Sequence, residues 1–124
     1  MANLILREES YKIIGTCMEV HNNLGHGFLE IVYKDALEYE FKKRRIPYER
    51  EKEYEVSYKN VILPHKFYAD FIVLDQIILE VKAVSGFNDA FIAQCINYLK
   101  VSQNRLSLLV NFGTERLEYK RIVF

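Results

Sequence analysis

The segment Tyr68–Lys82, with the sequence YADFIVLDQIILEVK, decides how the rest of the chain folds. Both halves are rich in Ile, Val, Leu and Phe, and Asp75-Gln76 interrupts the apolar run, which indicates two strands joined by a short turn. Strands this apolar are normally buried on both faces. Three charged residues nevertheless lie within them, Asp70, Glu80 and Lys82. A buried charge is costly unless it is paired or binds a metal.

The spacing of these charges is typical of a site for phosphodiester chemistry. Glu80 and Lys82 are two residues apart, so on a strand their side chains point to the same face. Carboxylate oxygens are ligands for Mg²⁺, which polarises a phosphate and lowers the pKa of a bound water. A nearby ammonium can position that water or offset charge in the transition state. The alternative is a structural ion pair between Lys82 and Glu80 or Asp70.

The length of the turn decides whether such a site can form. In an antiparallel hairpin, directly opposed residues share a face and successive residues alternate. A plain two-residue turn would place Asp70 and Glu80 on opposite faces. A three-residue loop over residues 74–76 would set Asp70 opposite Glu80, and one over residues 75–77 would set it opposite Lys82. We expect the first register, because it brings both carboxylates to one cation.

The composition predicts a single domain spanning residues 1–124. Half of the residues are apolar, and 17 Lys and Arg balance 17 Asp and Glu. This argues against disorder and, mildly, against a simple basic coat for nucleic acid. No apolar run approaches a membrane span and the N-terminus lacks a signal-peptide pattern, so a cytoplasmic protein is expected. Cys17 and Cys95 have no metal-ligand spacing and are expected to be reduced.

Periodicity gives a complete set of expected elements. Apolar residues at helical spacing predict helices over residues 10–22, 28–44 and 88–101. Apolar and alternating runs predict strands over residues 51–58, from 61 onward into the segment 68–82, and over 106–112 and 117–124. Ser10 and Asn88 are the expected N-caps, and Pro64-His65 is an expected bulge or break. The order of elements predicts an α/β fold with a mixed central β-sheet flanked by α-helices.

Two polar residues lie beside the apolar stripes of the first two helices. Glu30 is three residues before Tyr33, so it flanks the buried side of its helix. Its carboxylate either caps the helix N-terminus or points to the metal site. His21 continues the apolar stripe of the first helix and is either a core residue bonded to a loop carbonyl or a ligand.

The third helix carries two neighbouring stripes. Its core stripe is predicted to be Phe91, Cys95 and Leu99. Gln94 and Tyr98, four residues apart, form a second stripe that should face the site. Gln94 either orients a metal-bound water or a phosphate oxygen, or it caps the sheet edge.

Spaced motifs along the chain match one family. They are G-x-x-E-x-x-Y at residues 27–33, Val20-His21-x-x-Leu24-Gly25, Asp70, Glu80-Val81-Lys82, Gln94-x-x-x-Tyr98, Asn111-Phe112-Gly113 and Lys120-Arg121. On these residues, from about Tyr11 to Val123, the chain resembles the GxxExxY proteins of the PD-(D/E)XK nuclease-like superfamily. One departure is His26, where relatives commonly have Pro, which bears on the shape of the loop.

The resemblance implies a restriction-endonuclease-like core and a set of site residues. It implies that Asp70, Glu80 and Glu30 bind Mg²⁺ or Mn²⁺. The catalytic set adds Lys82, which assists the reaction, and Gln94, which lies on the helix beside the site. The candidates for contact with substrate are Tyr98, Tyr33 and His21.

The predicted function is that of a metal-dependent nuclease that hydrolyses phosphodiester bonds, with DNA preferred over RNA as partner and no membrane partner. A homodimer or a protein partner is compatible with so small a chain. The alternative is a noncatalytic nuclease-like module that binds nucleic acid or a protein with the same face, although a phosphate-binding cleft should carry Arg and Lys. A purely structural charge cluster ranks last, because three inward carboxylates with one lysine are unfavourable without a cation.

Overall fold

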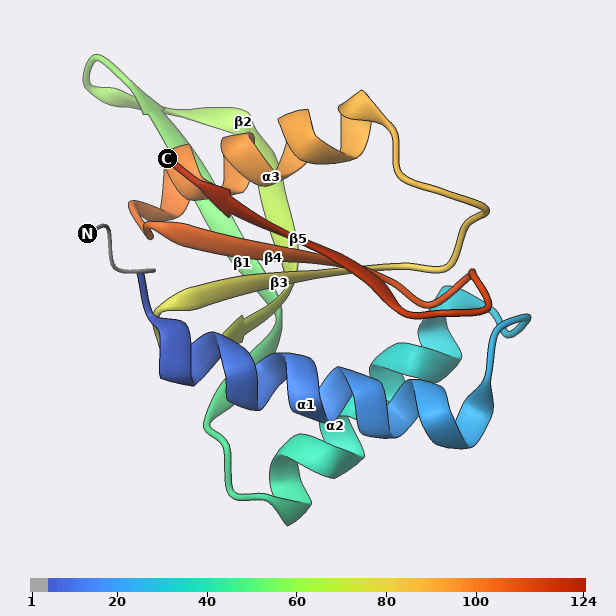
Figure 1. Ribbon diagram of the computed structural model, residues 1–124. Coiled ribbons are helices and arrows are strands. Elements are labelled where there is room, and N and C mark those ends of the chain that lie inside the picture. The colour runs from blue at the N-terminus through green and yellow to red at the C-terminus, as the bar shows by residue number, and fades with distance from the viewer. Residues whose placement is uncertain (1–4) are drawn as a thin grey trace, which may run out of the picture.

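The computed structural model describes residues 5–124 and contains three helices and five strands in those residues (Figure 1). In chain order they are α1 Arg7–Leu24, α2 Glu30–Lys43, β1 Tyr48–Tyr58, β2 Val61–Val73, β3 Ile77–Lys82, α3 Asp89–Ser102, β4 Leu106–Asn111 and β5 Glu118–Val123. The strands form one sheet in the order β1-β2-β3-β4-β5. The β3–β4 pair is parallel and the other pairs are antiparallel. The predicted α/β fold with a mixed sheet flanked by helices is confirmed.

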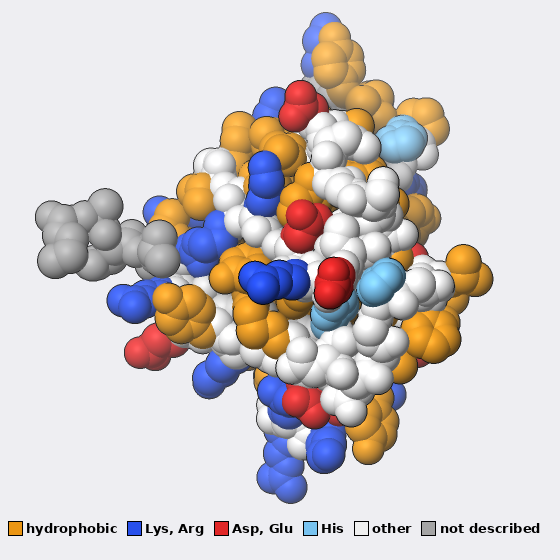
Figure 2. Space-filling view, turned by 45° about the vertical axis from the view of Figure 1, so that its right-hand side comes forward, with side chains coloured by type: hydrophobic (Ala, Val, Ile, Leu, Met, Phe, Trp, Pro, Cys, Tyr) orange, Lys and Arg blue, Asp and Glu red, His pale blue; other side chains and the backbone are white. Residues whose placement is uncertain are grey.

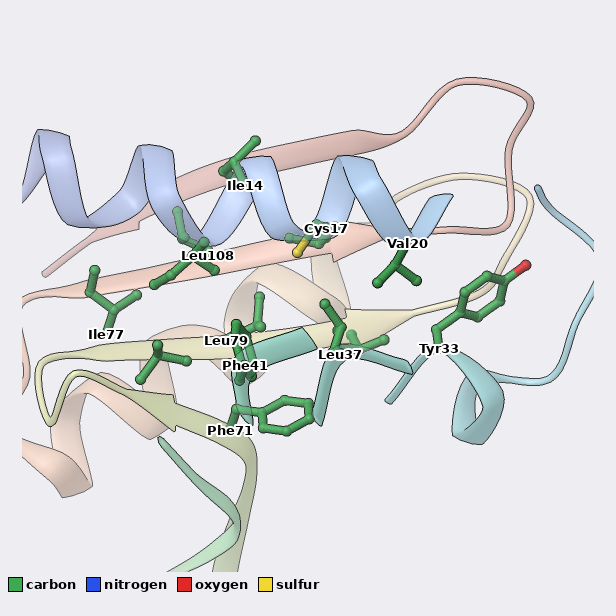
Figure 3. Close-up of a cluster of buried hydrophobic side chains, with 14 of the residues drawn as sticks. Ile14, Cys17, Val20, Tyr33, Leu37, Phe41, Phe71, Ile77, Leu79 and Leu108 are labelled. Atoms are coloured by element: carbon green, nitrogen blue, oxygen red, sulfur yellow. The ribbon is translucent and has the colours of Figure 1, made fainter. Parts of the chain in front are cut away.

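The sheet separates two apolar clusters. Helices α1 and α2 cover one face and α3 covers the other (Figure 1). On the α1–α2 side, side chains from both helices point at the strands in Figure 3: Ile14, Cys17, Val20, Leu37 and Phe41 meet Phe71, Ile77, Leu79 and Leu108. The α3 side is built on Cys95, Tyr98 and Leu99. Each large side chain buried in this way contributes about 1.5–3 kcal/mol, so the position of β3 between the clusters is strongly determined.

The ends of the helices correct one prediction and confirm another. Ser10 is not an N-cap, because α1 begins at Arg7 and Ser10 is buried inside it. Its hydroxyl bonds to the Arg7 carbonyl at 2.9 Å and accepts a bond from Arg121 at 2.7 Å. Asn88 does cap α3, where its side chain accepts the backbone N–H of Phe91 at 3.2 Å.

The predicted irregularity at Pro64-His65 is confirmed. The β1–β2 register shifts between Glu55, which pairs with Lys66, and Ser57, which pairs with Ile62. The extra residues in β2 therefore surround the proline, which cannot donate a ladder bond.

Both cysteine thiols are buried and unpaired. Burial raises the pKa of the Cys17 thiol to about 12 and that of Cys95 to about 11, so both stay protonated and unreactive near neutral pH. Among the described residues, no helix is long and apolar enough to span a membrane.

Candidate active site

The β2–β3 hairpin has the register that a shared site requires. Val73 pairs with Ile77 and Phe71 pairs with Leu79, so the loop comprises residues 74–76. Two of these residues, Leu74 and Asp75, have positive φ angles of 57° and 55°. The same register, continued by one residue, sets Asp70 opposite Glu80. The three-residue loop predicted from the sequence is confirmed.

Beyond the Phe71–Leu79 pair, carboxylates replace backbone carbonyls as acceptors between the strands. The Asp70 N–H donates to Glu80 Oε1 at 3.0 Å, and the Val81 N–H donates to Asp70 Oδ2 at 2.8 Å. Both acids are nearly inaccessible, with Asp70 9% and Glu80 2% exposed. Each acid is therefore oriented by a backbone donor at the point where the two strands diverge.

A second lysine lies in this site and was given no role by the sequence reasoning. Lys34, from the first turns of α2, is 7% exposed. Its Nζ lies 2.9 Å from Asp70 Oδ1 and also bonds to the Glu51 carboxylate. Lys34 follows Glu30 by four residues and so lies on the same face of α2, which is the signal that could have identified it. The prediction that a single lysine accompanies three carboxylates was wrong, because Lys34 lies in the site together with Lys82.

Two carboxylates of the site, Glu80 and Glu30, hold protons more tightly than isolated ones. Burial, and then the negative charge of Asp70, raises the pKa of Glu80 well above its usual value. The same two causes, burial first, raise the pKa of Glu30, against the opposing charges of Lys82 and Lys34. Glu30, at the N-terminus of α2, therefore lies within electrostatic reach of Asp70 on β2 and Lys82 on β3, although its carboxylate forms no hydrogen bond with either strand among the described residues.

Lys82 and the polar stripe of α3, Gln94 and Tyr98, form a chain of contacts. Lys82 Nζ lies 3.5 Å from Gln94 Oε1 and 4.7 Å from the centre of the Phe91 ring. Gln94 Nε2 lies 3.4 Å from the Tyr98 hydroxyl, which donates to the Tyr68 carbonyl at 2.9 Å. Gln94 thus faces the site, and Tyr98 anchors the end of that stripe to β2.

Tyr33 and His21 are buried and have internal partners. Tyr33 is 0% exposed, and its hydroxyl donates to the Gly25 carbonyl at 2.7 Å and accepts the Phe28 N–H at 3.2 Å. His21 is 7% exposed, with Nε2 2.9 Å from the Thr114 carbonyl oxygen. Of the two roles considered for His21, the structure therefore supports that of a core residue bonded to a loop carbonyl. Neither side chain is positioned for substrate contact, and Tyr33 instead fixes the loop that leads into Glu30.

The end of β4 supports the end of β3. The Phe112 N–H donates to the Lys82 carbonyl at 2.7 Å. The fully buried Asn111 side chain accepts the Val84 N–H and donates to the Val84 carbonyl, both at 3.0 Å. Gly113 lies against the same backbone, because a Cβ there would be 2.2 Å from the Val84 oxygen. These motif residues received no role from the sequence, and here they hold the segment that follows Lys82.

The donor chemistry of the site fits a hard divalent cation, since Asp70, Glu80, Glu30 and Glu51 offer carboxylate oxygens. Within residues 5–124, however, no three acidic, histidine or cysteine side chains converge as a metal-binding group. One reason is visible in the contacts: Asp70 Oδ1 is taken by Lys34, and its Oδ2 by the Val81 N–H.

The surface charge is mixed rather than basic. Figure 2 shows acidic, basic and histidine side chains dispersed among apolar ones on one face of the molecule, with no continuous basic area on that face. This agrees with the formal net charge of zero. Binding of a polyanion would therefore depend on particular residues rather than on overall charge.

The comparisons with known proteins agree with this geometry. The family model of the PD-(D/E)XK nuclease superfamily matches residues 7–122. The chain therefore belongs to the PD-(D/E)XK nuclease superfamily. The crystal structure of SSO0001 is similar in fold, with a TM-score of 0.61 at 21% identity, covering 74% of this chain and 48% of that one. The chain thus spans about half the length of that protein. No curated protein sequence matches the chain.

Proposed function

We propose that the protein is a metal-dependent nuclease that hydrolyses phosphodiester bonds of nucleic acid, DNA in preference to RNA. The observation that carries the proposal is the placement of Asp70 opposite Glu80, each held by a backbone N–H, with Lys82 two residues further along β3. Membership of the superfamily supports it, since Asp70 and Glu80-Val81-Lys82 match the D and E-x-K residues for which the superfamily is named.

In this proposal different residues of the chain bind the metal, position the attacking water and orient Lys82. Asp70 and Glu80, with Glu30 at the start of α2, would hold Mg²⁺ or Mn²⁺, which supplies phosphate polarisation and a more acidic water. Lys82 would position the attacking water or offset charge on the phosphate. Gln94 lies within 3.5 Å of Lys82 and would hold its ammonium toward the substrate.

The finer identity follows from the same residues. We infer that the chain is a GxxExxY protein acting as a single domain over residues 1–124, in the cytoplasm, as a monomer, a homodimer or with a protein partner. The motif residues support this: Gly27 has a positive φ of 111°, Glu30 begins α2, and Tyr33 is buried. Tyr33 holds the loop between Gly25 and Phe28, and that loop sets where α2 begins and hence where Glu30 lies.

One observation favours the noncatalytic alternative, a module that binds nucleic acid or a protein. The Asp70 carboxylate is already neutralised by Lys34, so the folded protein does not need a metal at that position. In that case Lys82, Lys34 and Gln94 would contact a phosphate or a partner without cleaving it.

The test is cleavage of labelled single-stranded DNA, duplex DNA and RNA with millimolar Mg²⁺ or Mn²⁺. The wild type should cleave at least one substrate, and Lys82→Ala and Asp70→Asn should lose about 10²-fold or more of the rate. Lys12→Ala, which removes an exposed lysine of α1, is the matched control and should retain full activity. Equal cleavage by Lys82→Ala and the control would remove the catalytic role, and retardation of a nucleic acid without cleavage would support the module.

A further inference from the structure

The ammonium group of Lys34, on α2, bridges two carboxylates from the neighbouring strands β1 and β2. Lys34 Nζ lies 2.9 Å from Asp70 Oδ1 and bonds to Glu51 Oε1. The Lys34 and Asp70 side chains are 9% and 12% exposed, whereas the Glu51 side chain is 50% exposed. The three groups thus run from the interior at Asp70 to the solvent at Glu51.

The backbone of β1 is distorted at this point. The β1–β2 ladder pairs Arg50 with Phe71 and Lys52 with Ala69, and it skips the Glu51–Asp70 pair between them. Glu51 has a φ of 55°, a left-handed conformation that costs a non-glycine residue about 1 kcal/mol or more. The register is the same on both sides of Glu51, so this is a local distortion without an extra residue, and the Glu51 carboxylate within it bonds to Lys34.

The position that the ammonium holds has the features of a cation site. A lysine ammonium is a compact point charge without the planar geometry of a guanidinium. The oxygens around it come from carboxylates on adjacent strands, which are also ligands for Mg²⁺ and Mn²⁺. The Asp70 oxygen on the other side is held by the Val81 N–H, so the carboxylate cannot turn away to meet a metal elsewhere without losing that bond.

We propose that the Lys34 ammonium holds a cation position between Asp70 and Glu51, and that a divalent metal ion displaces it there, with Glu51 as a ligand beside Asp70. The inference rests on the proposed metal dependence and adds to it a residue, Glu51, and an internal competitor, Lys34. The half-exposed Glu51 side chain gives the ion a route from solvent. Lys34 and the metal compete for the same oxygens, so removing the ammonium strengthens metal binding and removing Glu51 weakens it.

The experiment is calorimetric titration of Mn²⁺ and Mg²⁺ into the metal-free protein without nucleic acid, combined with thermal unfolding. Lys34→Met should bind at least tenfold more tightly than the wild type and show a larger metal-induced rise in Tm, because its unpaired acids destabilise the metal-free state. Glu51→Gln should bind at least tenfold more weakly. Glu53→Gln is the matched control, since Glu53 lies two residues along the same strand with a 45% exposed side chain paired to Lys66.

The outcomes separate this inference from the proposed function. If the wild type binds metal and Glu51→Gln binds as tightly as Glu53→Gln, the exchange at Lys34 is wrong while the metal-dependent nuclease stands. If Lys34→Met does not fold, the Glu51→Gln comparison decides alone. If no variant binds metal, both proposals fail. If only Lys34→Met binds metal, the ion does not displace the ammonium in the wild type, and both the exchange and the metal dependence of the wild type fail.

Discussion

Gly113 offers the sharpest test of how the fold supports the site. It follows β4, and its N–H donates to the Asn111 side-chain oxygen at 3.0 Å. A Cβ at this position would lie 2.2 Å from the Val84 oxygen, 2.3 Å from the Val84 nitrogen and 2.7 Å from the Ala83 carbonyl carbon. Non-bonded carbon contacts are optimal at about 3.5–4.0 Å. The Gly113→Ala variant must therefore displace the backbone after Lys82 by about 1 Å or more.

The magnitude follows from what that displacement breaks. Inserting a methyl group into a filled space costs about 1–3 kcal/mol. Moving Val84 also strains its two hydrogen bonds with Asn111, each worth about 1 kcal/mol. We expect Gly113→Ala to lower the free energy of unfolding by about 2–4 kcal/mol and Tm by on the order of 10 °C.

Gly86→Ala is the matched control, because Gly86 lies in the β3–α3 connection, two residues after Val84, and has no atom within 4 Å of an added Cβ. It should change the free energy of unfolding by less than about 1 kcal/mol. Both variants are measured by urea and thermal unfolding. If Gly113→Ala and Gly86→Ala unfold at the same urea concentration, the close approach of Gly113 to Val84 does not contribute to stability and the reasoning fails.

Two further variants test other parts of the site. Because the pKa of Glu80 is raised from 4.5, unfolding releases a proton as the pH rises from that value to the raised pKa, and wild-type stability falls across this range. Glu80→Gln should lose this slope and be more stable than the wild type at neutral pH in urea unfolding without metal; parallel pH curves would contradict it. Tyr33→Phe should lose about 1–3 kcal/mol, because the Gly25 carbonyl and Phe28 N–H lose their partner. The exposed Tyr39→Phe is its control in thermal unfolding, and equal Tm values would refute the role of the hydroxyl.

The register of the hairpin could be predicted from sequence because parity leaves few choices. Asp70 and Glu80 share a site only if the loop has an odd number of residues, and the loop over residues 74–76 satisfies this. Leu74 and Asp75 adopt positive φ angles without being glycine. The break in the apolar run at Asp75-Gln76 located the turn, but local propensity alone would not have given its length; the requirement that two charges meet did.

Contacts between distant segments explain what the sequence did not reveal. The hydroxyl of Ser10 is used by Arg121, 111 residues away, so a residue that looks like an N-cap lies inside the helix. Lys34 is one of several lysines on α2, and only the fold shows that it reaches Asp70 and Glu51. Side chains that act through tertiary contacts carry no periodic signal of their own.

Lys34 also changes the argument that leads from charge to function. Three inward carboxylates with one lysine would demand a cation, but the folded chain supplies its own ammonium at Asp70. Burial also raises the pKa values of Glu80 and Glu30, so these two acids keep their protons more readily. In the metal-free protein, the negative charge of the buried acids is therefore offset by the Lys34 ammonium, by backbone N–H groups and by bound protons. The presence of buried acids therefore does not separate an enzyme from a binding module, and the distinction depends on whether the folded protein binds a divalent ion at these acids and cleaves nucleic acid with it.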